Sequence, residues 1–319
     1  MTTPGDGSLK SLWADVRWRS TIFLLSLAFA TSAILATLYL VDRKPDPLTA
    51  EILVLGDSQL SFGGGPTLST FFEDLPNQCR DIATDSSDQE LLQDKRFSMI
   101  GTRSTSLQSW VTQKVRPWEL LCHKDKRWGV NASAWGEVKP DKRRYVQIGE
   151  GELFQVCQPD QPPIRHLLAP GYYSPELLMI YVGGNGAARL ARKPDLAQRD
   201  VDQFIKELPA NMGCIFMMTA PVYQTSQNER RLKAQTNLRA AFAKHGERCT
   251  FVDGHTPATR AAIEGQAQYF RKDDSGKVTD SYHANKDAGA AFLKLRRAPL
   301  CNALIKQFKA ITTARNRAS

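Results

Sequence analysis

The sequence predicts an α/β protein built on a doubly wound, parallel sheet of five strands. Short apolar runs alternate with longer segments of helical character along residues 51–297, which is the pattern of strands joined by crossover helices. The run 177–183 is apolar at nearly every position, as expected of a strand buried on both faces of a parallel sheet. Ligands of such sheets bind beyond the carboxyl ends of the strands. Residues that directly follow the strands are therefore the first candidates for a functional site.

The individual elements follow from the apolar runs and the turn residues between them. The predicted strands are residues 51–56, 97–101, 177–183, 214–220 and 249–253. The predicted helices are residues 66–75, 200–208, 229–245 and 286–297. Pro66 suits the first turn of a helix, and Pro221 ends the fourth strand. The polar segment 77–95 is predicted to be loop.

A long insertion separates the second and third strands. Residues 102–176 are more than a single crossover connection needs. They contain four of the six tryptophans, namely Trp110, Trp118, Trp128 and Trp135. A tryptophan ring offers a large apolar face that can stack on a sugar, so these residues are candidates for substrate binding. The alternative is that they form a small core of the insertion, and the sequence leaves both interpretations open.

An apolar segment near the N-terminus has the length of a membrane span. Residues 21–41 contain no charged residue. As a helix rising about 1.5 Å per residue, the segment would be about 30 Å long, which matches the hydrocarbon core of a bilayer. The bulky Leu38, Tyr39 and Leu40 at its end differ from the small-residue cleavage site of a secretory signal. The segment is predicted to be an uncleaved signal anchor, with a buried core helix as the alternative.

This anchor predicts the organisation of the chain. Residues 1–20 would be a cytoplasmic N-terminal segment, 21–41 the transmembrane helix, 42–50 a linker and 51–319 the globular domain. Basic residues lie on both sides of the span, so their distribution decides the orientation only weakly. All six cysteines follow the span, and an even number in one exported domain suits disulfides. The domain is therefore predicted to be periplasmic or extracellular.

The net charge of +9 is concentrated at the C-terminus. Residues 296–319 contain six basic residues and no acidic one. A basic helix on an anchored protein could contact anionic lipid or an acidic glycan, and the alternative is a solvated helix face. No signature of a nucleic-acid-binding domain accompanies the charge, so no nucleic-acid partner is expected.

Four short motifs lie at or near the ends of predicted strands and close to the C-terminus. They are Gly56-Asp57-Ser58, Met99-Ile100-Gly101, Val182-Gly183-Gly184-Asn185 and Asp280-Ser281-Tyr282-His283. Their order along residues 51–296 resembles the four sequence blocks of the SGNH (GDSL) hydrolase family. The resemblance implies a flavodoxin-like fold and serine hydrolase chemistry, for which no cofactor and no metal is expected.

Catalytic roles follow from this resemblance and from the chemistry of the residues. A serine hydroxyl needs a base within hydrogen-bond reach, so Ser58 is expected to be the nucleophile and His283 the base. Asp280 would hold the imidazole ring and stabilise its protonated form. Asp57 more simply organises the turn. The other histidines lack a carboxylate three residues before them and are expected in loops or on the surface; they are His123, His166, His245 and His255.

The resemblance also implies an oxyanion hole. Its donors would be the main-chain N–H groups of Ser58 and Gly101 and the side-chain amide of Asn185. Two positions depart from the family pattern, since Gly186 stands where many members have Asp, and Gln59 stands where they have Leu. These departures indicate a divergent branch whose substrate cannot be taken from the well-known lipases and esterases.

Three disulfides are predicted within this fold. Cys214 and Cys249 stand at the starts of neighbouring strands, which brings their Cα atoms toward the distance of about 4.4–6.8 Å that a bridge needs. Cys79 and Cys301 follow the first and last helices, and Cys122 would join Cys157 within the insertion. No CxxC motif occurs, so a structural zinc site is not expected.

Together these features predict an anchored extracytoplasmic serine esterase that removes O-acyl groups, most plausibly acetyl, from a cell-envelope or exported glycan. One alternative is an O-acyltransferase with the same triad, because water and a sugar hydroxyl resolve the same acyl-enzyme. The other is a non-catalytic glycan-binding or assembly subunit. The partners expected are an acylated glycan, the membrane and envelope polysaccharide machinery.

Overall fold

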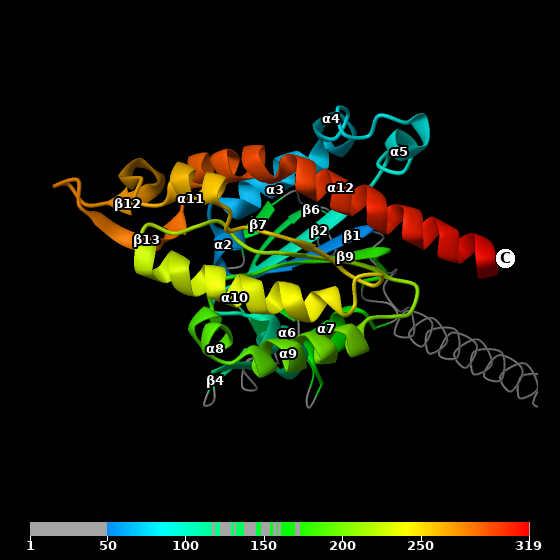
Figure 1. Cartoon of the computed structure of the whole chain (residues 1–319), viewed down its shortest axis with the longest axis horizontal. Coiled ribbons are helices and arrows are strands. Elements are labelled where there is room, and N and C mark those ends of the chain that lie inside the picture. Colours follow the sequence, from blue (N-terminus) through cyan, green and yellow to red (C-terminus); the bar gives the residue numbers. More distant parts are fainter. Residues whose placement is uncertain are drawn as a thin grey trace, which may run out of the picture. The chain divides into compact units, whose positions relative to one another are not determined.

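In the computed structural model, a seven-stranded sheet with the order β11-β10-β9-β1-β2-β6-β7 forms the centre of the described part of the chain (Figure 1). Its strands are β1 (Ile52–Gly56), β2 (Phe97–Thr102), β6 (Ala132–Gly136), β7 (Tyr145–Gln147), β9 (Leu177–Tyr181), β10 (Gly213–Met217) and β11 (Thr250–Val252). The five strands β11-β10-β9-β1-β2 are mutually parallel in flavodoxin-like order, as predicted. The prediction of a five-stranded sheet is incomplete, because the antiparallel strands β6 and β7 extend the sheet to seven strands.

The structure describes residues 50–116, 119–121, 129–130, 132–136, 145–147, 154–155, 158, 161–169 and 173–318. All of them belong to one compact unit, Pro47–Ser319. The predicted span 21–41 lies outside the described residues, as do the N-terminal segment and nearly all of the linker. Among the residues that are described, no helix is both long and apolar enough to cross a bilayer.

Helices cover both faces of the sheet (Figure 1). On one face lie α3 (Gly64–Glu73), α11 (Pro257–Ile263) and α12 (Lys286–Ala318). On the other lie α6 (Leu107–Thr112), α7 (Pro163–Leu167), α8 (Ala187–Arg192), α9 (Pro194–Glu207) and α10 (Thr225–Ala243). Alternate residues of β1 enter two separate apolar clusters, Leu53 and Leu55 on one face and Ile52 and Val54 on the other. The sheet is therefore doubly wound, as the apolar runs predict.

The register aligns the carboxyl ends of the central strands. Gly56 at the end of β1 pairs with Gly101 of β2 and with Tyr181 of β9. The segments that follow these three strands therefore emerge at one edge of the sheet. Two of these segments begin the motifs that carry Ser58 and Asn185.

The insertion extends the sheet instead of forming a body of its own in the described residues. Strand β6 pairs antiparallel with β2, and β7 pairs antiparallel with β6. Trp110 of α6 is fully buried in one apolar cluster, and Trp135 of β6 is 4% exposed in the other. The prediction that these two rings bind substrate is wrong, because both lie in the main core. Trp118 and Trp128 lie outside the described residues.

The basic C-terminal segment forms the second half of α12, which runs well beyond the predicted end at residue 297. Leu300, Leu304, Phe308 and Ile311 recur at helical spacing and are buried against the sheet. Three cations of α12 pair with carboxylates of the same domain: Arg297 with Asp81, Lys309 with Asp88 and Arg315 with Glu176. These pairs favour the interpretation of a solvated helix face.

Two of the three predicted disulfides are present. Cys79 after α4 (Leu75–Gln78) joins Cys301 of α12, with Cα atoms 5.5 Å apart, and Cys214 of β10 joins Cys249 before β11, with Cα atoms 4.4 Å apart. The third predicted pair, Cys122 and Cys157, lies outside the described residues.

Loop length predicts which bridge stabilises the domain more. The Cys79–Cys301 bridge closes a loop of 222 residues and Cys214–Cys249 one of 35 residues. Loop-closure entropy gives an upper contribution of about 5 kcal/mol for the first and about 4 kcal/mol for the second. We expect the paired Cys79→Ser/Cys301→Ser change to lower the free energy of unfolding in urea more than Cys214→Ser/Cys249→Ser. Free thiols at 79 and 301 in a non-reducing peptide map would contradict the assignment.

Candidate active site

Three side chains form a hydrogen-bonded chain at the edge of the sheet. Ser58 is the first residue of α2 (Ser58–Ser61), directly after β1. Its Oγ lies 2.9 Å from Nε2 of His283, and Nδ1 of the same ring lies 2.9 Å from Oδ2 of Asp280. A hydroxyl, an imidazole and a carboxylate in this sequence have the geometry of an activated nucleophile. The structure thus brings together the three residues predicted from two separate motifs.

Asp280 and His283 lie on a strand, whereas the sequence suggests a loop. They belong to β13 (Val278–Ala284), which pairs with β12 (Phe270–Lys272) in an antiparallel hairpin with an exposed tip at 273–277. Arg271 faces Asp280 and Phe270 faces Ala284, so one step on β12 spans four residues of β13. This bulge turns residues 281–283 out of the regular ladder. It allows Asp280 and His283, three residues apart, to meet.

The carboxylate of Asp280 is held by several donors. Its Oδ1 accepts main-chain N–H groups of Tyr282 at 3.0 Å and His283 at 3.1 Å. Burial raises the pKa of Asp280, but the hydrogen bonds from the His283 ring and from these two N–H groups outweigh it and hold the pKa below its ordinary value. Asp280 is therefore ionised at neutral pH, as the partner of a protonated imidazole must be.

Gln59 connects the nucleophile to the hairpin. Its buried side-chain amide donates a hydrogen bond to the main-chain carbonyl of Tyr282, the residue before His283. A Leu side chain at this position could not make this bond. Gln59 therefore has a structural role, which the sequence alone does not reveal.

The glycine-rich turn after α2 makes a second connection to the hairpin. The N–H of Gly63 donates to the carbonyl of Ala284 at 3.0 Å, and a Cβ at position 63 would lie only 2.0 Å from the carbonyl oxygen of Asn285. Only glycine allows this approach. Phe62 stacks on the His283 ring, with 4.1 Å between centroids. The imidazole is thus held on its face as well as through its nitrogens.

Asp57 organises the turn beneath Ser58, as predicted. It caps α2 by accepting the N–H of Gln59 at 2.8 Å, and its other oxygen accepts the N–H of Gly183 at 3.2 Å. It is 1% exposed. Burial raises its pKa, an effect that the main-chain donors and the nearby Arg231 guanidinium partly offset. Asp57 therefore joins the segments after β1 and β9.

Arg231 is a buried cation that the sequence analysis does not identify. It projects from α10, is 5% exposed, and donates to the carbonyl of Ala220 at 3.2 Å. A Cβ on Gly184 would lie 2.4 Å from its Nη2, so the guanidinium packs directly under the segment that carries Asn185. Burial lowers its pKa, and Asp57 opposes this shift. In the sequence it is one of several basic residues on a polar helix, and no local pattern marks it as buried.

The triad opens into a pocket of about 240 Å³. The residues that line it are Asp57, Ser58, Gln59, Arg103, Ser104, Gly184, Asn185, Gln227, Arg231, Tyr282 and His283. Within the described part of the chain, neither the main-chain N–H of Ser58 nor the side-chain amide of Asn185 donates a hydrogen bond. Both are therefore free to bind a substrate oxygen.

The structure does not place Gly101 in the pocket wall. It lies inside β2, paired on one side with Gly56 and on the other with Ser133. A Cβ there would lie 3.0 Å from the main-chain N of Ser61, so glycine at 101 makes room for α2. Arg103 and Ser104 form this wall instead, and Ser104 has a left-handed φ of 63°. The apolar run of β2 does not show where the strand ends.

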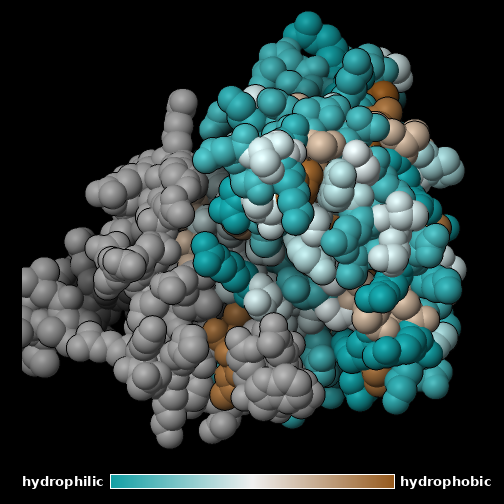
Figure 2. All heavy atoms as spheres, turned by 90° about the vertical axis from the view of Figure 1, so that its left-hand side faces the viewer, coloured by the Kyte–Doolittle hydropathy of each residue, from teal (hydrophilic) through white to brown (hydrophobic). Residues whose placement is uncertain are grey.

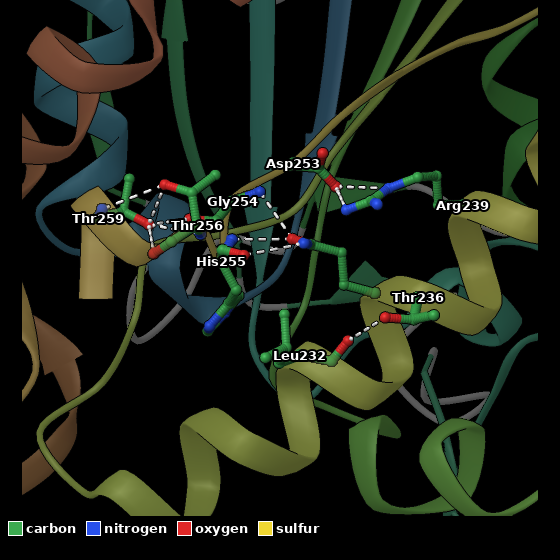
Figure 3. Close-up of polar contacts among 9 residues, drawn as sticks. Leu232, Thr236, Arg239, Asp253, Gly254, His255, Thr256 and Thr259 are labelled. Carbon is green, nitrogen blue, oxygen red and sulfur yellow. Dashed lines mark hydrogen bonds and ion pairs between the residues drawn. The ribbon is translucent and has the colours of Figure 1, made fainter. Parts of the chain in front are cut away.

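The other histidines stand apart from the triad. His245 pairs with Asp202 near the surface. His255 lies in a loop, as predicted, but its side chain is buried, with 2% exposed. The main chain of this loop at Gly254 and His255 (Figure 3) is hydrogen-bonded to the side chain of Gln235. Burial, together with Arg231 and Arg260, holds the pKa of His255 well below the ordinary value, so its ring is neutral. His166 is also largely buried, and His123 lies outside the described residues.

Metal ligation has no candidate among the residues that the structure describes, where no three His, Cys, Asp or Glu side chains group together.

Comparison with known proteins gives only distant similarity. No protein-family model matches the sequence, and no curated protein matches it. Among solved structures, a DUF4886 family protein from Bacteroides uniformis is 10% identical, with a TM-score of 0.38 over 83% of this chain and 94% of that chain. A family two carbohydrate esterase from Clostridium thermocellum, in complex with cellohexaose, is 13% identical, with a TM-score of 0.37 over 82% of this chain and 66% of that chain.

Proposed function

We propose that this protein is a serine esterase that removes short O-acyl groups, most simply acetyl, from a glycan. The observation that carries the proposal is the chain of hydrogen bonds from Ser58 through His283 to Asp280 on the wall of a pocket. Such a chain activates a hydroxyl that is otherwise a weak nucleophile. The free amide of Asn185 on the same pocket supplies a donor of the kind that acyl transfer requires.

The reaction proceeds through an acyl-serine. Ser58 Oγ attacks the carbonyl carbon of the ester while His283 Nε2 takes its proton, and Asp280 stabilises the imidazolium through Nδ1. The N–H of Ser58 and the amide of Asn185 bind the oxyanion. Collapse breaks the bond to the sugar oxygen, which leaves with the proton from His283. Water then loses a proton to His283 and attacks the acyl-serine, releasing the carboxylic acid and restoring Ser58.

The pocket and its surroundings support a short acyl group on a polar carrier. The volume of about 240 Å³ is small, and most of its lining side chains are polar or charged. Figure 2 shows that the described surface on the side of the β12–β13 hairpin is mainly hydrophilic, with small separate apolar spots. A long-chain lipid would require a larger apolar surface. A glycan ester fits this site better than a triglyceride.

The proposal places the enzyme on the outer side of a membrane. Both described cysteine pairs are disulfide-bonded, and structural disulfides are typical of oxidising compartments. The apolar segment 21–41 would anchor the domain, and the short segment 42–50 would keep Ser58 near the membrane surface. The substrate would then be a cell-envelope or exported glycan.

The first prediction concerns the nucleophile. We expect Ser58→Ala to lower hydrolysis of p-nitrophenyl acetate by at least about 10³-fold, because Ser58 supplies the one hydroxyl that contacts the His283 ring within the described residues. A fluorophosphonate probe should label the wild type and the Ser61→Ala control, which changes another serine of α2, but not Ser58→Ala. Labelling that survives in Ser58→Ala would refute the assignment. Product analysis of an acetylated glycan, with and without an acceptor sugar, separates hydrolysis from transfer.

The second prediction concerns the bond between Gln59 and Tyr282. We expect Gln59→Leu to lower kcat about tenfold with little change in KM, because the carbonyl before His283 loses its donor and the imidazole is less well held. The control is Gln203→Leu, which removes a hydrogen bond from a side-chain amide to the carbonyl of Val111, outside the residues that line the pocket. Equal losses of kcat in the two variants would show a general effect of destabilisation.

The third prediction concerns topology. Alkaline phosphatase is active only outside the cytoplasm, so we expect activity when it is fused after residue 50 and after residue 319 of the full chain. Inactive phosphatase in both stably expressed fusions would place the domain in the cytoplasm, and the envelope substrate would then be excluded.

A further inference from the structure

The pocket wall carries a cation without a partner. The side chain of Arg103 lines the pocket, is exposed, and makes no hydrogen bond or ion pair with any residue that the structure describes. Several other exposed arginines are paired with carboxylates, for example Arg165 with Glu207 and Arg239 with Asp253. The guanidinium of Arg103 is thus free to bind a ligand that enters the pocket.

The acidic groups of the site cannot neutralise Arg103, because both are already engaged. Asp57 is buried, accepts main-chain N–H groups, and faces Arg231. Asp280 binds the His283 ring and lies 4.0 Å from the exposed Arg271. Among the described residues around the triad, these two carboxylates accompany three cations, Arg103, Arg231 and Arg271. The region around the triad retains an excess of positive charge, which favours an anionic ligand.

Arg103 lines the same pocket as Ser58 and His283. Gly56 of β1 pairs with Gly101 of β2, and Ser58 and Arg103 each lie two residues beyond these paired glycines. Adjacent strands are about 4.8 Å apart, and both residues line one pocket of about 240 Å³. A group bound by Arg103 would therefore lie within a few atoms of the acyl carbon that Ser58 attacks.

We infer that the ester substrate carries a carboxylate close to its scissile bond, and that Arg103 binds this carboxylate. The inference rests on the proposed esterase function and specifies its substrate class. A planar guanidinium can bind a carboxylate through two parallel hydrogen bonds, which gives orientation as well as affinity. The carboxylate belongs either to the acyl group, as in a succinyl ester, or to the sugar, as in an acylated uronate.

The experiment measures a preference and not a single rate. The full-length protein is assayed on two pairs of esters that differ by one carboxylate. The first pair is mono-4-nitrophenyl succinate and 4-nitrophenyl acetate, and the second is acetylated methyl galacturonide and acetylated methyl galactoside. Arg103→Gln removes the charge, and Arg103→Lys keeps the charge without the two parallel donors of a guanidinium. Arg317→Gln is a control near the end of α12, about 45 Å along the helix from its first residue, Lys286.

We expect the wild type to favour the acidic member of one pair, and the pair that shows the preference identifies the source of the carboxylate. Arg103→Gln should lower the ratio of kcat/KM for the acidic over the neutral ester at least tenfold, because a charge-assisted hydrogen bond is lost. Arg103→Lys should keep part of the ratio, and Arg317→Gln all of it. Added salt should lower the ratio of kcat/KM for the acidic over the neutral ester in the wild type, because salt screens the attraction between the two charges. A ratio unchanged in Arg103→Gln, or no preference in either pair, overturns the inference.

A binding measurement separates failure of the inference from failure of the proposed function. Ser58→Ala and Ser58→Ala/Arg103→Gln are titrated with succinate, galacturonate and galactose by NMR. If no ester is hydrolysed, the esterase proposal fails, but binding of either acid that is lost on changing Arg103 keeps the carboxylate site. Equal binding of acidic and neutral ligands, or acid binding that survives Arg103→Gln, overturns it.

Discussion

The buried carboxylate of Asp57 is the constraint on which the site depends. It satisfies main-chain donors from two segments, the N–H of Gln59 after β1 and the N–H of Gly183 after β9. A main-chain N–H buried without an acceptor costs about 1–3 kcal/mol, so the two segments are held at one carboxylate. Ser58 stands on the first segment and Asn185 on the second. Their mutual position is therefore set before any substrate arrives.

The cost of burying this charge explains Arg231. An isolated carboxylate in an apolar interior is strongly unfavourable, whereas one with hydrogen-bond donors and a nearby cation is tolerated. Arg231 supplies the cation from α10 and itself contacts the carbonyl of Ala220. Helix α10 is thus linked electrostatically, through Arg231, to the turn beneath the nucleophile. The resulting rigidity suits a site that must hold catalytic groups within a fraction of an ångström.

The parts of the fold that could be predicted are those encoded locally. The apolar runs of β1, β9 and β10 and the motifs with Ser58 and His283 are short patterns with a direct structural meaning. The antiparallel strands β6 and β7 could not be predicted, because β6 pairs with β2 from a distant part of the chain and β7 then pairs with β6. The burial of Trp110, the hydrogen bond of Gln59 and the free cation at Arg103 depend on tertiary contacts. The sequence does not show that Gly101 lies against α2 and outside the pocket wall, because a glycine near a strand end has the same local pattern whether it faces a ligand or a helix.

The Cys79–Cys301 bridge has a consequence for a chain that meets proteases. The tip of the β12–β13 hairpin, residues 273–277, is exposed, and a cut there falls inside the loop that the bridge closes. Such a cut would place Ser58 on one fragment and Asp280 and His283 on the other. The two fragments would remain covalently joined through Cys79 and Cys301. A nicked molecule would therefore keep its triad in one particle, although the three residues no longer belonged to one continuous polypeptide.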